Sequence, residues 1–147
     1  MSRAMAPPQP RKEALEAAAR SLIHRDRTVA ELDSDLERHG VDPVDRALAI
    51  KTMVALGYLD DSRMAANRAS ALAERGYGDE AIRFDLGGRG VDDELVDDAI
   101  AGLEPEAERA SRIADRRGPG ARTVRALAAK GFSADSIETA VGAGPDP

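Results

Sequence analysis

Paired acidic side chains are the first candidates for chemistry in this sequence. Asp60 and Asp61 stand side by side in the stretch GYLDDSRMA (residues 57–65), and four more aspartates lie in DDELVDD (residues 92–98). Two neighbouring carboxylates can share the roles of general acid and general base, and carboxylates on one face of a helix can hold Mg²⁺. The two clusters therefore raise proton transfer and metal binding as chemistries to weigh.

The partners that such chemistry needs are missing from the sequence. There is no cysteine, and His24 and His39 have neither a cysteine partner nor the HExxH spacing of a zinc site. The glycine-rich stretches at 76–78 and 87–90 lack the Lys-Ser/Thr pair that follows a phosphate-binding loop. No nucleophile is spaced with a base and an orienting group. We therefore predict a protein that is not an enzyme and uses no cofactor and no metal.

The segments around these acids repeat three times along the chain. LERHGV (36–41), LGGRGV (86–91) and LAAKGF (127–132) each place a leucine four residues before a glycine and an apolar residue after it. A glycine there ends a helix in the left-handed conformation, and the apolar residue folds back onto that helix. The residue that follows is a good N-cap for another helix. The turn glycines are Gly40, Gly90 and Gly131, and the N-caps that follow them are Asp42, Asp92 and Ser133.

An amphipathic segment precedes each of these turns, so that each repeat holds three helices. Aromatic residues make up only 3% of the chain, and Ala and Leu fill the apolar positions, which favours helices over strands. One such repeat cannot bury enough surface alone. We predict an all-α fold of three tandem three-helix repeats stacked into an elongated, curved body. The predicted parts are a flexible N-terminal segment (1–10), repeat 1 (11–59), repeat 2 (60–103), a shortened repeat 3 (104–142) and a flexible tail (143–147).

The stretch GYLDDSRMA has a definite place in this scheme, because it joins repeat 1 to repeat 2. Gly57 ends the third helix, and Tyr58 and Leu59 fill the junction. Asp60 or Asp61 caps the fourth helix and meets the positive end of its dipole. The acids at 92–98 fall in the first turn and on the solvated face of another helix. A structural role is therefore favoured over catalysis for both clusters.

The order of motifs in the central part of the chain resembles that of a known family. GYLDD is followed by Arg63 and Ala65, then by RGYG (75–78) and by a segment of the form I-x-x-D-L-x-x-R-G-V (82–91). These motifs resemble the RecX regulatory proteins of bacterial recombination. The specific match covers residues 54–103, and the repeat extends the resemblance to about residues 11–142.

The resemblance implies both a fold and a partner. It implies three helical units that bind the RecA recombinase, in the groove of its filament on single-stranded DNA. It further implies that the chain inhibits strand exchange and ATPase activity, within homologous recombination, DNA repair and the SOS response.

Charge is segregated along the chain, whose formal net charge is −6. Residues 78–104 hold nine acidic residues and two arginines, whereas residues 105–131 hold seven basic residues and three acidic ones. In the helix expected at 106–117, arginines at i, i+3 and i+7 share one face and alanines take another. The predicted contacts with the filament and its DNA are Arg109, Arg112, Arg116, Arg117, Arg122, Arg125 and Lys130.

Two functions from different classes stay open. One is a modulator of RecA filaments, and the other is a stand-alone helical nucleic-acid-binding module that acts without RecA. A helix-turn-helix reader of duplex DNA is disfavoured, because the helix at 43–56 offers a groove only Arg46 and Lys51. With no signal segment and no run of about 18 apolar residues, we expect a cytoplasmic monomer without a membrane partner.

Overall fold

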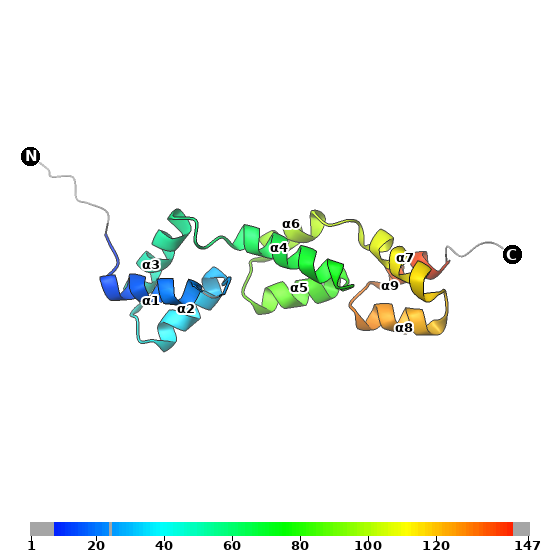
Figure 1. Ribbon diagram of the computed structural model, residues 1–147, viewed down its shortest axis with the longest axis horizontal. Helices are drawn as coiled ribbons and strands as arrows, with labels where there is room; N and C mark the ends of the chain where they lie inside the picture. The colour runs from blue at the N-terminus through cyan, green and yellow to red at the C-terminus, as the bar shows by residue number, and fades with distance from the viewer. Residues whose placement is uncertain (1–7, 24, 143–147) are drawn as a thin grey trace, which may run out of the picture. The chain divides into compact units, whose positions relative to one another are not determined.

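The described part of the chain is helical throughout. The computed structural model describes residues 8–23 and 25–142, which form nine α-helices and no strand (Figure 1). The all-α fold class is confirmed. His24 and the predicted flexible ends lie outside the described residues, except for residues 8–10, which precede the first helix. The helices are α1 (Lys12–Leu22), α2 (Val29–Arg38), α3 (Pro43–Ala55), α4 (Asp61–Glu74), α5 (Asp79–Gly88), α6 (Asp93–Ala101), α7 (Glu106–Arg117), α8 (Ala121–Ala129) and α9 (Ala134–Gly142).

The helices are grouped into two compact units, which divide between Met64 and Ala65, inside α4. Unit 1 holds α1 to α3, and unit 2 holds most of α4 together with α5 to α9. In unit 2, α9 packs against both α7 and α8. The core of unit 1 consists of Ala14, Ala18, Leu32, Leu36, Ala49, Met53 and Leu59. The core under α7 to α9 consists of Ala110, Ala114, Leu127, Phe132, Ile137 and Ala140.

The repeated turns close with the same hydrogen bonds. Gly40, Gly90 and Gly131 have φ angles of 79°, 82° and 88°, in the left-handed region that only glycine adopts readily. In the first turn the Val41 N–H donates to the Leu36 carbonyl over 3.0 Å, and the turns after α5 and α8 repeat this bond. These are Schellman motifs, in which the glycine turn satisfies carbonyls that the end of a helix leaves open.

At the junction between α3 and α4, some residues take roles other than those predicted from the sequence. Leu59 is 1% exposed, but the Tyr58 side chain is 68% exposed, so the prediction that Tyr58 fills the junction is wrong. The Asp60 carboxylate accepts from the Arg63 N–H over 3.1 Å and caps α4. The Asp61 carboxylate instead accepts from the N–H of Val29, the first residue of α2, over 2.9 Å. The two acids are thus a cap and a tie between helices.

The start of α5 lies directly on the end of α8. The Gly78 N–H donates to the Lys130 carbonyl over 2.8 Å, and the Glu80 N–H donates to the Gly131 carbonyl over 3.2 Å. The free N–H groups of one helix therefore meet the free carbonyls of another, with their dipoles aligned favourably. A Cβ on Gly78 would stand 2.5 Å from the backbone of Gly131, and a Cβ on Gly131 would stand 2.6 Å from the Ala81 backbone nitrogen. Only glycine permits this approach.

Among the described residues, no helix has the length and apolar character that crossing a membrane requires.

Candidate functional site

The predicted contact residues in α7 and α8 separate into buried, paired and unpaired cations. Arg109 is buried, with its side chain 7% exposed. Arg112 is exposed and pairs with the Glu104 carboxylate. Lys130, the C-cap of α8, places its ammonium 4.2 Å from the centroid of the Tyr77 ring. The four that are exposed and have no ion pair within the described residues are Arg116, Arg117, Arg122 and Arg125.

Arg109 belongs to the interior, so its prediction as a filament contact is wrong. Its Nε donates to the Glu104 carbonyl over 2.9 Å, and its Nη1 donates to the Tyr77 carbonyl over 2.9 Å. Its Nη2 pairs with the Asp79 carboxylate at the first residue of α5. The guanidinium also lies 5.9 Å from the centroid of the Phe132 ring. Arg109 therefore holds α7 against the start of α5 and is not available to a partner.

The carboxylate of Glu106, the first residue of α7, ties together the starts of three helices. It accepts from the Asp79 N–H over 2.7 Å, from the Ser133 N–H over 3.1 Å and from the Ser133 hydroxyl over 2.7 Å. Ser133 in turn caps α9, since its hydroxyl accepts from the Ser136 N–H over 3.1 Å. Glu106 occupies the same place in repeat 3 as Asp61 in repeat 2, because each accepts from the first N–H of an earlier helix. The repeat pattern gave no signal for this tie.

The hydrogen bonds around Glu106 predict a loss of stability in acid. Burial opposes ionisation of the carboxyl group, but hydrogen bonds from Ser136, Ser133 and the Asp79 N–H outweigh it and lower the pKa of Glu106 below its ordinary value of 4.5. A group whose pKa is lower in the folded chain stabilises the fold above its unfolded pKa, and this stabilisation is lost as the pH falls through the folded pKa. The melting temperatures of the wild type and of Glu106→Gln should therefore differ at pH 7 and converge below about pH 4.5.

Glu108 supplies a matched control for this experiment, because it is an exposed acid in the first turn of the same helix. Glu108→Gln should change the melting temperature only slightly, since exposed charges contribute little to stability. Melting curves followed by circular dichroism from pH 7 to pH 3 measure both offsets. A Glu106→Gln offset that does not change with pH would contradict the role of the carboxylate.

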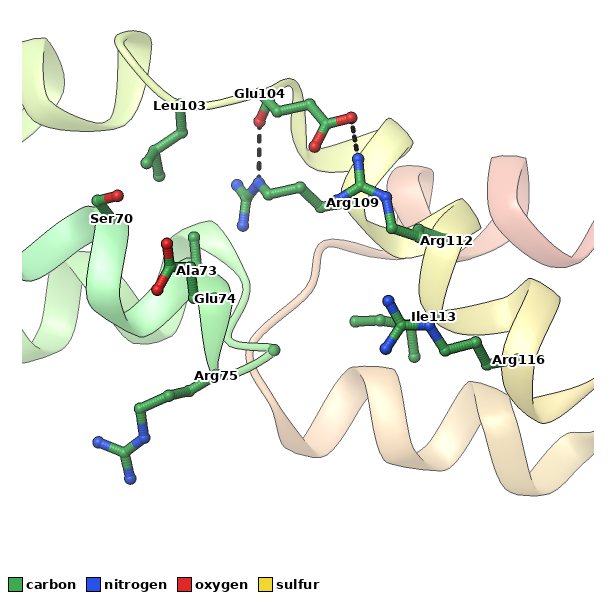
Figure 2. A pocket seen from close by; sticks show the side chains of 11 residues that line it. Ser70, Ala73, Glu74, Arg75, Leu103, Glu104, Arg109, Arg112, Ile113 and Arg116 are labelled. Atoms are coloured by element: carbon green, nitrogen blue, oxygen red, sulfur yellow. Dashed lines mark hydrogen bonds and ion pairs between the residues drawn. The ribbon is translucent and has the colours of Figure 1, made fainter.

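A groove in unit 2 runs beside the exposed face of α7. Its volume is about 510 Å³, and the side chains of Arg112, Ile113 and Arg116 project toward it from α7 (Figure 2). Arg75, after the end of α4, also lines the groove, and its guanidinium lies 5.7 Å from the centroid of the Tyr77 ring. The groove also contains the carboxylates of Glu74 and Glu104, so its charge is mixed.

Four exposed arginines of unit 2 that have no ion pair within the described residues lie where α7 ends and α8 begins. Arg116 and Arg117 are in the last turn of α7, where cations also complement the helix dipole, and Arg122 and Arg125 are one turn apart on α8. We call these four residues the α7–α8 basic surface. Planar guanidinium groups suit bidentate contacts with carboxylates and phosphates. No group of three or more histidines or acids suited to a metal ion occurs among residues 8–23 and 25–142.

The fold and this surface define a class: an all-α protein of tandem three-helix repeats with exposed arginines that have no ion pair within the described residues. Comparison with known proteins supplies the family. The family model for the second three-helix domain of RecX matches residues 60–100. The regulatory protein RecX of Xanthomonas campestris pv. campestris (strain B100) is 32% identical over 81% of this chain and 80% of its own length. The regulatory protein RecX of Stenotrophomonas maltophilia (strain R551-3) is 30% identical over 94% of this chain and 91% of its own.

The chain belongs to the RecX family of regulatory proteins. Solved structures agree with its fold. The crystal structure of RecX from Lactobacillus salivarius superimposes with a TM-score of 0.77 at 21% identity, over 88% of this chain and 93% of that chain. A second crystal structure of a regulatory protein RecX gives a TM-score of 0.71 at 23% identity, over 87% and 70% of the two chains. The family suggested by the motif order is confirmed.

Proposed function

We propose that this chain is a non-enzymatic regulator that binds the RecA recombinase and its filament on single-stranded DNA. In this proposal it acts in the cytoplasm as a monomer and inhibits the strand exchange and ATPase activity of the recombinase. Family membership supports the partner, and the α7–α8 basic surface is the observation that supports the mode of contact. A filament on DNA offers both acidic protein side chains and phosphates, and guanidinium groups bind either.

The α7–α8 basic surface gives a direct test. Arg116→Gln, Arg122→Gln and Arg125→Gln together remove three exposed cations, so the melting temperature should stay nearly unchanged. The affinity for recombinase assembled on single-stranded DNA should fall about tenfold or more, equivalent to at least about 1.4 kcal/mol. The remaining affinity should also depend less steeply on salt concentration. Pull-down and fluorescence titration with assembled filaments measure both quantities.

A control variant with the same change in charge comes from unit 1. Arg11, Lys12 and Lys51 are exposed, and changing all three to Gln should leave filament affinity close to that of the wild type. If the control variant loses affinity instead, the contact lies on unit 1. If the wild type binds bare single-stranded DNA as tightly as the filament, the chain is a stand-alone nucleic-acid-binding module and the proposal fails.

A further inference from the structure

Unit 1 contains a second hollow, whose lining includes three arginines. Its volume is about 420 Å³, and it lies among the end of α1, the connection to α2 and the end of α2. Neither Arg20 nor Arg25 has an ion pair within the described residues. The polar residues that line the hollow are Arg20, Ser21, Arg25, Arg27, Asp35 and His39.

Arg27 is the cation in this hollow that the fold holds in place. Its Nε donates to the Ser21 carbonyl over 2.9 Å, and this bond fixes the guanidinium while using only one of its five N–H groups. Arg27 is half-buried, whereas Arg20 and Arg25 are exposed. One fixed guanidinium and two adjustable ones therefore converge on the same space.

The one carboxylate in the hollow already has partners. Asp35 pairs with Arg38 over 2.9 Å, and the Nδ1 of His39 lies 3.8 Å from the same carboxylate oxygen. Hydrogen bonds from the Ser21 hydroxyl and the Arg38 guanidinium lower the pKa of Asp35, and the nearby charges of Arg27 and His39 lower it further. The Ser21 hydroxyl is buried beside this carboxylate. Asp35 therefore faces Arg27, Arg38 and His39, whereas Arg20 and Arg25 have no carboxylate partner within the described residues.

The groove of unit 2 also holds both paired and unpaired cations. There Arg109 pairs with Asp79 and Arg112 pairs with Glu104, whereas Arg116 has no ion pair within the described residues. In the hollow of unit 1 the cations without an ion pair are Arg20 and Arg25. Like charges that lie close together repel one another, and a bound anion reduces that repulsion.

We propose that the hollow of unit 1 binds a phosphate group, supplied by a single-stranded nucleic acid or by a free phosphate compound. Arg20, Arg25 and Arg27 donate to its oxygens. Three guanidinium groups suit the charge and the several oxygens of a phosphate better than the two oxygens of a single carboxylate. The site is distinct from the α7–α8 basic surface and needs no recombinase.

Two double variants of the full chain test the site. The hollow variant, Arg20→Gln with Arg25→Gln, removes the two exposed cations of the hollow. The control variant, Arg11→Gln with Lys12→Gln, removes two exposed cations at the start of α1. Fluorescence anisotropy with a labelled single-stranded oligothymidylate, without recombinase, measures the affinity of each. The hollow variant should bind about tenfold more weakly, and its salt slope should be smaller by about 1.4, which is two cations at about 0.7 each on a single strand. The control variant should match the wild type.

A second probe separates the two sources of phosphate. Inorganic pyrophosphate, titrated by calorimetry and as a competitor of the oligothymidylate, should bind the wild type and not the hollow variant if a free phosphate compound suffices. If only oligothymidylate binding depends on Arg20 and Arg25, the backbone of a single strand is the ligand. The proposal is overturned if the two double variants lose equal affinity, or if neither probe distinguishes the hollow variant from the wild type. These two measurements, oligothymidylate binding and pyrophosphate binding, do not depend on whether the triple variant of the α7–α8 basic surface binds filaments.

Discussion

Gly131→Ala is expected to destabilise unit 2 by about 2–5 kcal/mol. About 1–2 kcal/mol comes from forcing a side chain into the left-handed conformation, since the φ of Gly131 is 88°. About 1–3 kcal/mol more comes from overpacking, because the new Cβ would stand 2.6 Å from both the nitrogen and the Cβ of Ala81. Neither the start of α5 nor the end of α8 can withdraw without breaking the backbone hydrogen bonds that join them.

Gly76→Ala is the matched control for Gly131→Ala within the same unit. Gly76 has the same φ of 88° and ends α4 with the same type of turn, but its nearest neighbour would be the Ile113 Cδ1 at 3.9 Å, an ordinary contact. It should therefore cost only the conformational term, about 1–2 kcal/mol. Urea unfolding of both variants followed by circular dichroism measures the difference. Equal midpoints for Gly131→Ala and Gly76→Ala would show that α5 and α8 do not meet as described.

The positions of the turns were predictable because the conformation of a turn glycine is a local property. Gly40, Gly90 and Gly131 each follow a leucine by four residues, and the six-residue pattern is enough to specify a Schellman turn. The pattern does not predict which other segment of the chain packs against the turn. Gly78 and Gly131 are far apart in the sequence, and neither one alone indicates that their backbones touch.

The charged residues show more clearly that sequence spacing does not predict contacts between helices. Helical spacing places Arg109 and Arg112 on neighbouring parts of α7, yet one is buried and the other is exposed. The difference arises because the start of α5 brings the Tyr77 carbonyl and the Asp79 carboxylate to Arg109. Spacing along one helix reports which residues share a face. It does not report which part of that face another helix covers.

The residues at the junction between α3 and α4 have different roles for a similar reason. Tyr58 and Leu59 are both apolar enough to fill a junction, and only the packing shows that Leu59 joins the core of unit 1. Spacing predicts a cap at Asp60 or Asp61, and the structure gives this role to Asp60, whose partner is three residues away. For Asp61 the partner is the N–H of Val29, in another helix, which sequence spacing does not indicate.

Arg109→Ala is expected to cost about 3–5 kcal/mol, the range found when one partner of a buried ion pair is removed. The substitution leaves the Tyr77 and Glu104 carbonyls without their donor and the Asp79 carboxylate without its counter-charge. It also removes the methylene groups and the cation beside the Phe132 ring. Since α7 would keep only the Glu106 hydrogen bond to the start of α5, unit 2 should unfold at a much lower urea concentration than the wild type.

Arg112→Ala is the control, because it removes an arginine one turn away on the same helix. Arg112 is about half exposed, and its pair with Glu104 should contribute at most about 1 kcal/mol. If Asp79 causes part of the loss in Arg109→Ala, adding Asp79→Asn should recover some of it, because the neutral amide tolerates the missing partner. Unfolding midpoints for the single variants and the double variant measure this coupling. Equal midpoints for Arg109→Ala and Arg112→Ala would mean that Arg109 is a surface residue after all, and would return it to the set of candidate filament contacts.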